Sequence, residues 1–375
     1  MSNLTSNIPI ISVKGDSYSR GFELGRAAKD MILRNVQYYF YLWSTYSGMD
    51  KSRENELVSK FAPVIEKYDS EILQEMRGVS EGAGVSLEEI IAINCRYELV
   101  WAQMQYNSPT GRRYECTSMG AAPEVTAKGH TLLGQNWDYK PHARKNCVIV
   151  EELQEPDRPN IVMHTEAGIL GQKGINSAGI GVTVNALTSD QDKLSPKVPF
   201  FVIVRGALNK RTLDQAMLAA TSAERAVSGN LMLAQEGGEI VDLELTPDDF
   251  GSIFPQEGLI SHANNFIDPH CTSRVTDKIK AVDPGSLIRT NRSYRLLQKR
   301  AGKISELDFQ EILKDHFGYP NSICAHPNPN HTFDFQEETI ASVIFDLENR
   351  TITISRGEPC CNPYKEIRFE SLQHK

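Results

Sequence analysis

The spacing of apolar residues divides the chain into two parts with different periodicity. As far as about residue 105, apolar side chains recur every three or four residues, which is the period of an amphipathic helix. This pattern predicts helices over residues 17–46, 54–84 and 85–104. Ser86, followed by an acidic first turn, is typical of a helix N-terminus. The first part is therefore predicted to be mainly helical.

After Cys116 the pattern changes to short runs rich in β-branched residues, which Gly, Asn, Asp and Pro separate. Such runs are typical of strands and hairpins. They cover residues 130–139, 146–154, 159–168, 175–187, 230–245, 258–266 and 339–357. The segment "ENR", Glu348 to Arg350, is a candidate hairpin turn within the last of them.

Helical periodicity returns between these strands, over residues 198–222, 286–302 and 305–317. The strands and helices do not alternate regularly, as they would in a parallel α/β sheet. A layered α+β fold is the better prediction.

Composition and charge narrow the classes of function. The 375 residues are 40% hydrophobic and 23% charged, as in ordinary globular proteins, and the net charge is −8. This charge disfavours nucleic acid or an anionic membrane as the main partner. The sequence shows neither an apolar run long enough to span a bilayer nor the pattern of a secretory signal, so a cytoplasmic location is expected.

The glycine-rich and cysteine-containing segments give no clear cofactor site. "EGAGVS" and "GINSAGIGV" do not have the glycine spacing of a nucleotide-binding loop, so no cofactor is predicted. Cys324, His326 and His331 could bind zinc, but a fourth ligand is not evident, so no metal is predicted. The seven cysteines have no regular spacing and do not indicate a disulfide framework.

Cys116 opens the segment "CTSMGAAPEVTAKGHTLLGQNWDY". The pattern predicts a strand, a turn around Lys128–Gly129 and a second strand that ends at Asp138. Such a hairpin would bring Asp138 close to Cys116. On these residues alone, a structural cysteine is favoured over a nucleophile.

Several longer motifs, in order along the chain, point to a family. They are "SRGFELG", "EMRGVSEGAGVSLEEIIAIN", "CTS" followed by "GQNWDY", "EAGILGQKGINSAGIGVTVNAL", "SHANNF", "SICAHP" and "ETIASVIFDLENRTITISRGEPCCNPY". With these motifs the chain resembles the acyl-coenzyme A:isopenicillin N acyltransferase family (peptidase family C45) of the N-terminal nucleophile hydrolases. It is more distantly similar to choloylglycine hydrolases and penicillin V acylases. The resemblance implies a four-layer αββα sandwich.

The resemblance also implies that the chain cuts itself between Glu115 and Cys116. A mainly helical α fragment, residues 1–115, and a β fragment, residues 116–375, would stay associated as one domain. The cut would give Cys116 a free α-amine, whose pKa of about 7.7–8.0 suits it to act as the base for its own thiol.

Four further residues take roles from the family by position. Asp138 matches an aspartate that orients the amine, and Asn264 an asparagine whose side-chain amide donates to the oxyanion. Asn185 matches an asparagine whose backbone N–H completes the oxyanion hole. Arg292 matches an arginine close to the nucleophile.

Two positions depart from the family pattern. Glu115 stands where a small or flexible residue is usual, which puts the rate of self-cleavage in question. Asn291 stands before Arg292, where a serine linked to acyl-group handling is frequent. Acyl transfer of the penicillin type is therefore less certain.

The leading hypothesis is a self-processing cysteine hydrolase that cleaves the linear amide bond of a small N-acyl substrate through an acyl-thioester on Cys116. The alternative is acyl-CoA-dependent N-acyl transfer of the isopenicillin N/6-aminopenicillanic acid type. Hydrolysis ranks first because no pantetheine or nucleotide site can be recognised in the sequence. A second alternative is an unprocessed, non-catalytic or metal-binding relative that uses Cys324, His326 and His331.

Overall fold

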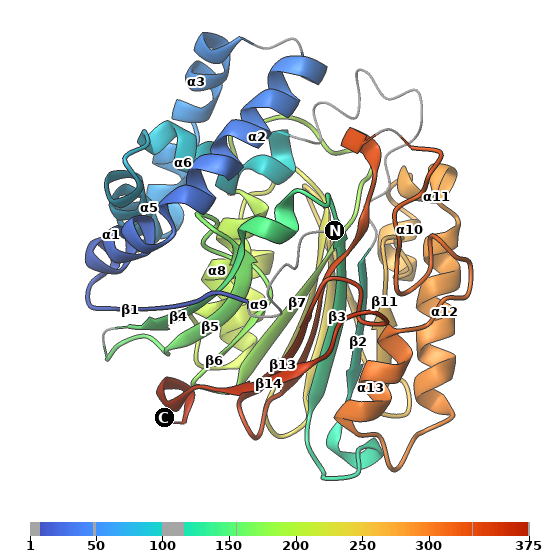
Figure 1. Ribbon diagram of the computed structural model, residues 1–375. Coiled ribbons are helices and arrows are strands. Elements are labelled where there is room, and N and C mark those ends of the chain that lie inside the picture. Colours follow the sequence, from blue (N-terminus) through green and yellow to red (C-terminus); the bar gives the residue numbers. More distant parts are fainter. Residues whose placement is uncertain (1–7, 48–49, 100–115, 155, 332, 374–375) are drawn as a thin grey trace.

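Two β-sheets packed face to face form the centre of the protein (Figure 1). A computed structural model describes residues 8–47, 50–99, 116–154, 156–331 and 333–373. One sheet has eight strands in the order β1-β4-β5-β6-β7-β8-β9-β10, and the other has six in the order β11-β2-β3-β12-β13-β14. Neighbouring strands are antiparallel, except that β1 runs parallel to β4.

The strands of the eight-stranded sheet are β1 (Ile10–Lys14), β4 (Cys147–Leu153), β5 (Ile161–Glu166), β6 (Gly174–Asn176), β7 (Ile180–Ala186), β8 (Gly229–Gln235), β9 (Ile240–Leu245) and β10 (Phe250–Ile253). Those of the six-stranded sheet are β2 (Cys116–Ala121), β3 (Leu132–Tyr139), β11 (Leu259–His262), β12 (Glu338–Asp346), β13 (Thr351–Arg356) and β14 (Lys365–Arg368).

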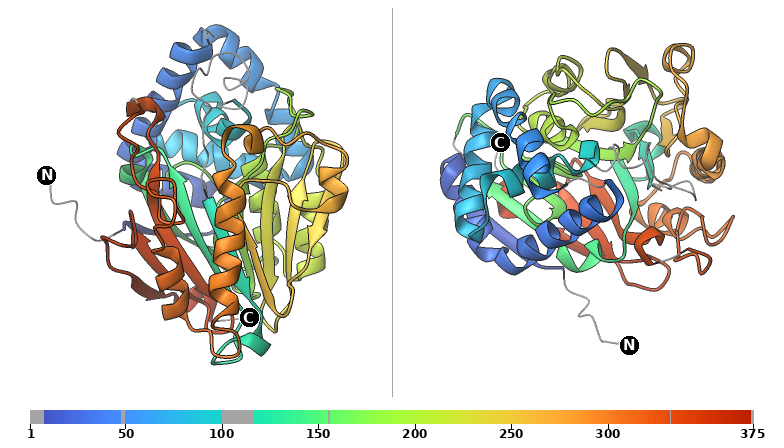
Figure 2. Two further views of the ribbon diagram at one scale, coloured as in Figure 1. Left: turned by 90° about the vertical axis from the view of Figure 1, so that its right-hand side faces the viewer. Right: turned by 90° about the horizontal axis from the view of Figure 1, so that it is seen from above.

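Helices cover the outer face of each sheet (Figures 1 and 2). On the eight-stranded side lie α1 (Ser17–Ala27), α2 (Lys29–Ser47), α3 (Lys51–Ser59), α4 (Ala62–Tyr68), α5 (Ser70–Ala83), α6 (Leu87–Asn94), α8 (Phe200–Leu208) and α9 (Leu213–Thr221). On the six-stranded side lie α12 (Gly285–Gln298) and α13 (Glu306–Leu313). The short helix α10 (Pro269–Thr272) contacts β10 at the edge of the eight-stranded sheet, and α11 (Ile279–Val282) precedes α12. Short 3-10 turns occupy Pro123–Val125, Ala143–Asn146, Phe333–Phe335 and Glu370–Leu372.

The four layers confirm the αββα prediction. The alternation of side chains along β2 shows how the layers are made. Met119 packs with Phe309 of α13 on the outer face, whereas the Ser118 hydroxyl donates to Asn185 of β7 in the facing sheet at 2.6 Å. Among the described helices, each is too short or too polar to cross a lipid bilayer.

Two glycine-containing helices, α1 and α5, pack unusually closely. A Cβ on Gly21 would lie 2.1 Å from the carbonyl oxygen of Glu75, and one on Gly78 would lie 2.1 Å from that of Tyr18. Only glycine allows the two backbones this approach. The glycines of "SRGFELG" and "EMRGVSEGAG" therefore have a structural role.

The N-terminal part is not purely helical. Residues 10–14 form β1, the edge strand of the eight-stranded sheet, which pairs with β4. This strand is not among the segments predicted from the sequence pattern, because a run of five residues shows its period only weakly. β1 precedes the predicted cut and β4 follows it, so one sheet contains residues from both sides of the cut.

Candidate active site

Cys116 is the first residue of β2, which lies between β11 and β3 in the six-stranded sheet. The predicted hairpin is present: β2 pairs with β3, and Cys116 lies opposite Trp137. The side chain of Cys116 is on the same side of the strand as Ser118, the side that faces the other sheet. The thiol is thus held between the two sheets, and the residue is 7% exposed.

Two side chains from other elements hold the backbone of Cys116. Its nitrogen donates to Oδ1 of Asn264 at 2.8 Å, and its carbonyl oxygen accepts from the Arg289 guanidinium at 2.7 Å. Asn264 follows β11, and Arg289 belongs to α12. Both backbone polar groups of the nucleophile are therefore fixed by buried side chains.

The orientation of the Asn264 amide follows from its partners. Its Oδ1 accepts from Cys116 and, at 3.1 Å, from Arg289, while its Nδ2 donates to the carbonyl oxygen of Ala186 at 3.0 Å. The flipped amide would place donor against donor and oxygen against oxygen. In this arrangement the side-chain oxygen, rather than the nitrogen, faces the backbone of Cys116.

Asp138 lies near the nucleophile, at the end of β3. Its Oδ1 accepts from the hydroxyl of Thr339 at 2.5 Å, and that hydroxyl in turn accepts from the backbone N–H of Ala325 at 2.9 Å. The carboxylate is buried and is oriented by the neighbouring strand β12.

The Cys116 thiol is poorly ionised in this environment. Burial raises its pKa to about 12, and the negative charge of Asp138 acts in the same direction. The backbone N–H of Asp138 and the charges of Lys173 and Arg289 oppose the shift without reversing it. At neutral pH a thiol of this pKa is ionised to only about one part in 10⁵. To act as a nucleophile, Cys116 would therefore need a base.

Lys173 is a second buried ionisable group close to Cys116. Its Nζ lies 3.6 Å from the centre of the Trp137 ring and donates to Gln172 at 2.7 Å. Burial lowers the pKa of Lys173 to about 7, so part of its population is neutral at physiological pH. Lys173 lies within the motif "EAGILGQKGINSAGIGVTVNAL", but a lone lysine there gives no signal of a chemical role.

The structure brings four of the five predicted catalytic residues together. Asn185 is connected to β2 through Ser118, and Asn264 contacts Cys116 directly. Arg292 instead pairs with Asp315, each of its two nitrogens donating at 2.5 Å, and its guanidinium lies over the Phe317 ring. The arginine at the nucleophile is Arg289, one helical turn earlier.

The helical period offers a signal for Arg289 that the motif comparison missed. The buried positions of α12 are Ser286, Arg289, Ser293 and Leu297, one stripe with steps of three and four residues. Arg292 lies outside this stripe, and its side chain is 32% exposed. The structure therefore places Arg289, and not Arg292, beside Cys116.

The predicted cut lies only partly within the described residues. Cys116 is described, whereas Glu115 lies outside the described ranges. Of the three predicted metal ligands, Cys324 and His326 lie together, with Sγ and Nε2 3.7 Å apart. His331 is not part of their group; His316 and Cys360 are.

Comparison with known proteins decides the family. A model of the family described as acyl-coenzyme A:6-aminopenicillanic acid acyl-transferase matches residues 125–360, more than half of the chain. The chain belongs to this family. The resemblance inferred from the sequence motifs is confirmed.

A similar curated protein carries the same description. The 40 kDa form of acyl-coenzyme A:6-aminopenicillanic-acid-acyltransferase from Emericella nidulans is 25% identical over 353 residues, which cover 93% of this chain and 92% of the relative. The similarity to this relative therefore extends over almost the whole chain.

Solved structures of amide hydrolases are more distant. A mutant form of conjugated bile acid hydrolase from Clostridium perfringens is 12% identical and matches with a TM-score of 0.45 over 68% of this chain and 97% of its own. Penicillin V acylase from Agrobacterium tumefaciens is 13% identical and matches with a TM-score of 0.43 over 64% of this chain and 83% of its own.

Proposed function

We propose that this protein is a cysteine-dependent enzyme that cuts its own chain before Cys116 and then cleaves the amide bond of a small N-acyl substrate. The observation that carries the proposal is the position of Cys116, at the start of a buried strand with its backbone held by Asn264 and Arg289. A cysteine that only packed in the core would not need two buried polar side chains on its backbone.

The self-cleavage has two steps. The Cys116 thiol loses its proton to a base and adds to the carbonyl carbon of residue 115, so that a C–S bond forms and the C–N bond breaks. The amine that leaves takes up a proton and becomes the α-amine of Cys116. Water then hydrolyses the thioester and releases the carboxyl group of residue 115. Lys173, with its lowered pKa of about 7, is suited to accept the first proton.

After the cut, the new α-amine supplies the base that the internal cysteine lacks. An α-amine has a pKa of about 7.7–8.0, so a useful fraction is neutral at physiological pH. The Cys116 nitrogen already donates to Asn264 Oδ1, and this contact would orient the amine beside its own thiol. Asp138 then acts through its negative charge on the amine.

Charge that develops on the substrate carbonyl needs donors. Arg289 is a buried cation of the site and pairs with Asp283 at 3.5 Å, so its position is fixed before substrate binds. The backbone N–H of Asn185 and the amide of Asn264 are the further donors assigned by position. For Asn264 this role requires its Nδ2 to leave the carbonyl oxygen of Ala186.

Buried contacts between the two fragments support their continued association. β1 of the α fragment pairs with β4 of the β fragment. Glu75 of α5 accepts from Arg205 of α8 at 2.9 Å, and Arg205 also pairs with Glu152 of β4. Breaking a buried ion pair of this kind costs about 3–5 kcal/mol. The fragments are therefore expected to stay together in native conditions.

Hydrolysis and acyl transfer share the acyl-thioester and differ in what attacks it. The description of the family favours an acyl-CoA donor and an amine acceptor such as 6-aminopenicillanic acid. We place hydrolysis of an N-acyl amide first, because the sequence shows no recognisable pantetheine or nucleotide site. Transfer from acyl-CoA to an amine is the second candidate.

Trapping the acyl group tests this proposal. Processed protein is mixed with a panel of N-acyl amides and, separately, with acyl-CoA, and the β fragment is weighed by mass spectrometry after an acid quench. We expect an adduct of the acyl mass on the β fragment, which neutral hydroxylamine removes, as it does a thioester. Cys116→Ala should give no adduct.

The fate of the acyl group then separates the two candidates. Product formed with N-acyl amides and unaffected by added amines indicates hydrolysis. Product that requires acyl-CoA and an amine indicates transfer. Turnover by Cys116→Ala would overturn both, because each depends on the same nucleophile.

A further inference from the structure

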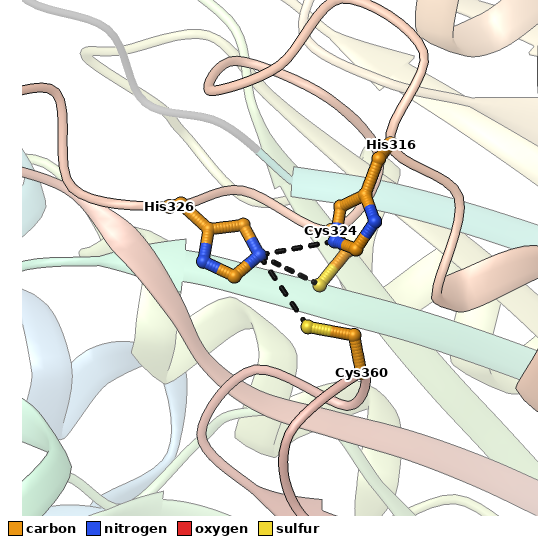
Figure 3. A group of neighbouring side chains, drawn as sticks. All are labelled: His316, Cys324, His326 and Cys360. Atoms are coloured by element: carbon orange, nitrogen blue, oxygen red, sulfur yellow. Dashed lines mark hydrogen bonds between the residues drawn. The ribbon is translucent and has the colours of Figure 1, made fainter.

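A group of four metal-ligating side chains lies outside the catalytic centre (Figure 3). The side chains of His316, Cys324, His326 and Cys360 point toward one another, and their ligand atoms all lie within 4.8 Å of one another. His316, Cys324 and His326 come from the segment after α13, and Cys360 from the segment after β13. Two segments far apart in the sequence thus supply one Cys₂His₂ set.

The spacing of these atoms fits a tetrahedral zinc ion. Zinc binds thiolate sulfur at about 2.3 Å and imidazole nitrogen at about 2.0–2.1 Å, which puts neighbouring S and N ligands about 3.6 Å apart and two nitrogens about 3.3 Å apart. From His326 Nε2, the distances are 3.7 Å to Cys324 Sγ, 3.4 Å to Cys360 Sγ and 3.0 Å to His316 Nε2.

Hydrogen bonding alone does not explain this arrangement. One imidazole nitrogen has either one hydrogen or one lone pair in the ring plane, so it makes one good hydrogen bond. Three polar atoms converge on His326 Nε2, as Figure 3 shows. A cation at the centre of the group would bind all four ligand atoms at once.

The backbone around the ligands is held in place by other contacts. The N–H of Cys324 donates to the carbonyl oxygen of Asp315 at 3.0 Å, and that of His326 donates to Pro320 at 2.9 Å. Arg292 binds the Asp315 carboxylate with two hydrogen bonds of 2.5 Å, beside His316. These contacts fix the backbone of the loop before a ligand binds. The partner of Arg292 is Asp315 of this loop.

We propose that His316, Cys324, His326 and Cys360 form a structural zinc site. Two thiolates and two imidazoles form a soft donor set that suits zinc. Four protein ligands fill a tetrahedral shell and leave no position for substrate, which is the property of a structural rather than a catalytic site. The site revises the expectation from sequence, which considered His331 as a candidate ligand beside Cys324 and His326 and predicted no metal.

The site is connected to the active site through one residue. Ala325 lies between two of the ligands, and its N–H donates to the Thr339 hydroxyl, which donates to the catalytic carboxylate of Asp138. A bound zinc ion fixes the loop on which this hydrogen-bond chain depends. Zinc thus supports the orientation of Asp138 without touching the substrate.

Metal content of the full-length protein tests the proposal without reference to catalysis. The purified chain is stripped with a chelator under reducing conditions, titrated with Zn²⁺ or Co²⁺ and analysed by elemental mass spectrometry and absorption spectroscopy. We expect one zinc ion per chain and, for cobalt, the thiolate charge-transfer and ligand-field bands of a tetrahedral site. The thermal midpoint should rise when zinc is added.

The chain offers a matched control for each type of ligand. Cys360→Ser is compared with Cys361→Ser, its neighbour outside the ligand set, and His316→Ala with His331→Ala. Cys360→Ser and His316→Ala should lose at least about tenfold in zinc affinity, whereas the two controls should bind as the unchanged chain does. His316 is exposed, so its removal leaves the core intact.

Two results would overturn the proposal. One is a reduced chain that binds no zinc. The other is zinc binding that survives both Cys360→Ser and His316→Ala, because the metal would then be elsewhere.

Discussion

Two arginines one helical turn apart on α12 have different surroundings. Arg289 is 2% exposed and reaches the carbonyl of Cys116, whereas Arg292 is partly exposed and pairs with Asp315. The chemistry of a side chain here depends on which face of the helix it occupies. Motif matching by position cannot resolve a shift of three residues within one helix, but the helical period can.

Arg289→Met should lower the rate of turnover at Cys116 by about 100-fold or more, because it removes a preorganised cation from the reacting centre. Arg289→Lys should recover part of the rate by restoring the charge. Arg292→Met should stay within about fivefold of the unchanged chain, since a partly exposed ion pair contributes about 1 kcal/mol or less. Steady-state kinetics on the best substrate of the panel measures all three. A larger loss of rate in Arg292→Met than in Arg289→Met would instead assign the stabilisation of charge at Cys116 to Arg292.

Asn264→Asp separates the two functions of this side chain. The variant keeps an oxygen that accepts from Cys116 and Arg289 but loses the amide donor. If the amide stabilises the oxyanion, kcat should fall by about 10²–10³. A variant that retains full kcat would show that Asn264 only positions the Cys116 nitrogen, with which its Oδ1 makes a hydrogen bond in this structure.

At the scale of the element, the hairpin of β2 and β3 was predictable and the edge strand β1 was not. A turn at Lys128–Gly129 between two β-branched runs is a local signal, and Gly129 has a positive φ of 69°. β1 depends on its partner strand β4, which is far away in the sequence. The pattern within a short stretch of sequence gives no information on which distant strand it will pair with.

The contact between α1 and α5 should tolerate no added methyl group. Gly78→Ala would place a Cβ 2.1 Å from the carbonyl oxygen of Tyr18, so the helices would have to separate. We expect a loss of stability of about 1–3 kcal/mol, as for other overpacked sites. Denaturant unfolding measures it, with the exposed Glu23→Ala on α1 as the control. Equal stability of Gly78→Ala and the unchanged chain would contradict the close approach.

The side chain of Glu98, in the N-terminal part of the chain, contacts the start of helix α8. The protonation of Glu98 should make the stability of the fold depend on pH. Its carboxylate accepts from the N–H of Phe200, the first residue of α8, at 2.7 Å. Burial raises the pKa of Glu98 to about 8, while the Phe200 contact and Arg96 lower it. The unfolded carboxyl has a pKa of about 4.3.

Between about pH 4.3 and 8 the folded chain therefore holds a proton that the unfolded chain has lost. Stability should fall as the pH rises through this window, by up to about 1.4 kcal/mol per pH unit. Glu98→Gln should flatten the dependence while keeping an acceptor for Phe200. Urea unfolding at several pH values measures this in uncleaved Cys116→Ala chains, and an unchanged slope would contradict it.

At the scale of the whole molecule, helical and strand segments could be predicted from period, and the layered α+β class from their order. The four-layer arrangement came from the family resemblance, since periodicity does not show how sheets stack. The zinc ligands illustrate the limit. Cys324 and His326 are close in the sequence, but Cys360 joins them only through the fold. Residue spacing therefore suggested His331, which lies outside the group.

The role proposed for Cys116 also depends on the arrangement of the whole molecule. As an internal residue it is a buried thiol whose pKa is raised to about 12 and whose own nitrogen is tied up in a peptide bond. As the first residue of a second fragment it carries its own base. The sheets, α12 and the segment after β11 hold its backbone in place, as the proposed cut would require.

Intact mass spectrometry of the purified chain tests this account most directly. The unchanged chain should appear as two species, residues 1–115 and 116–375, that elute together in native conditions and separate on denaturation. Cys116→Ala should remain one species of 42.0 kDa. A single 42.0 kDa species in fully active, unchanged protein would contradict the central claim, because Cys116 would then act without the amine that the cut supplies.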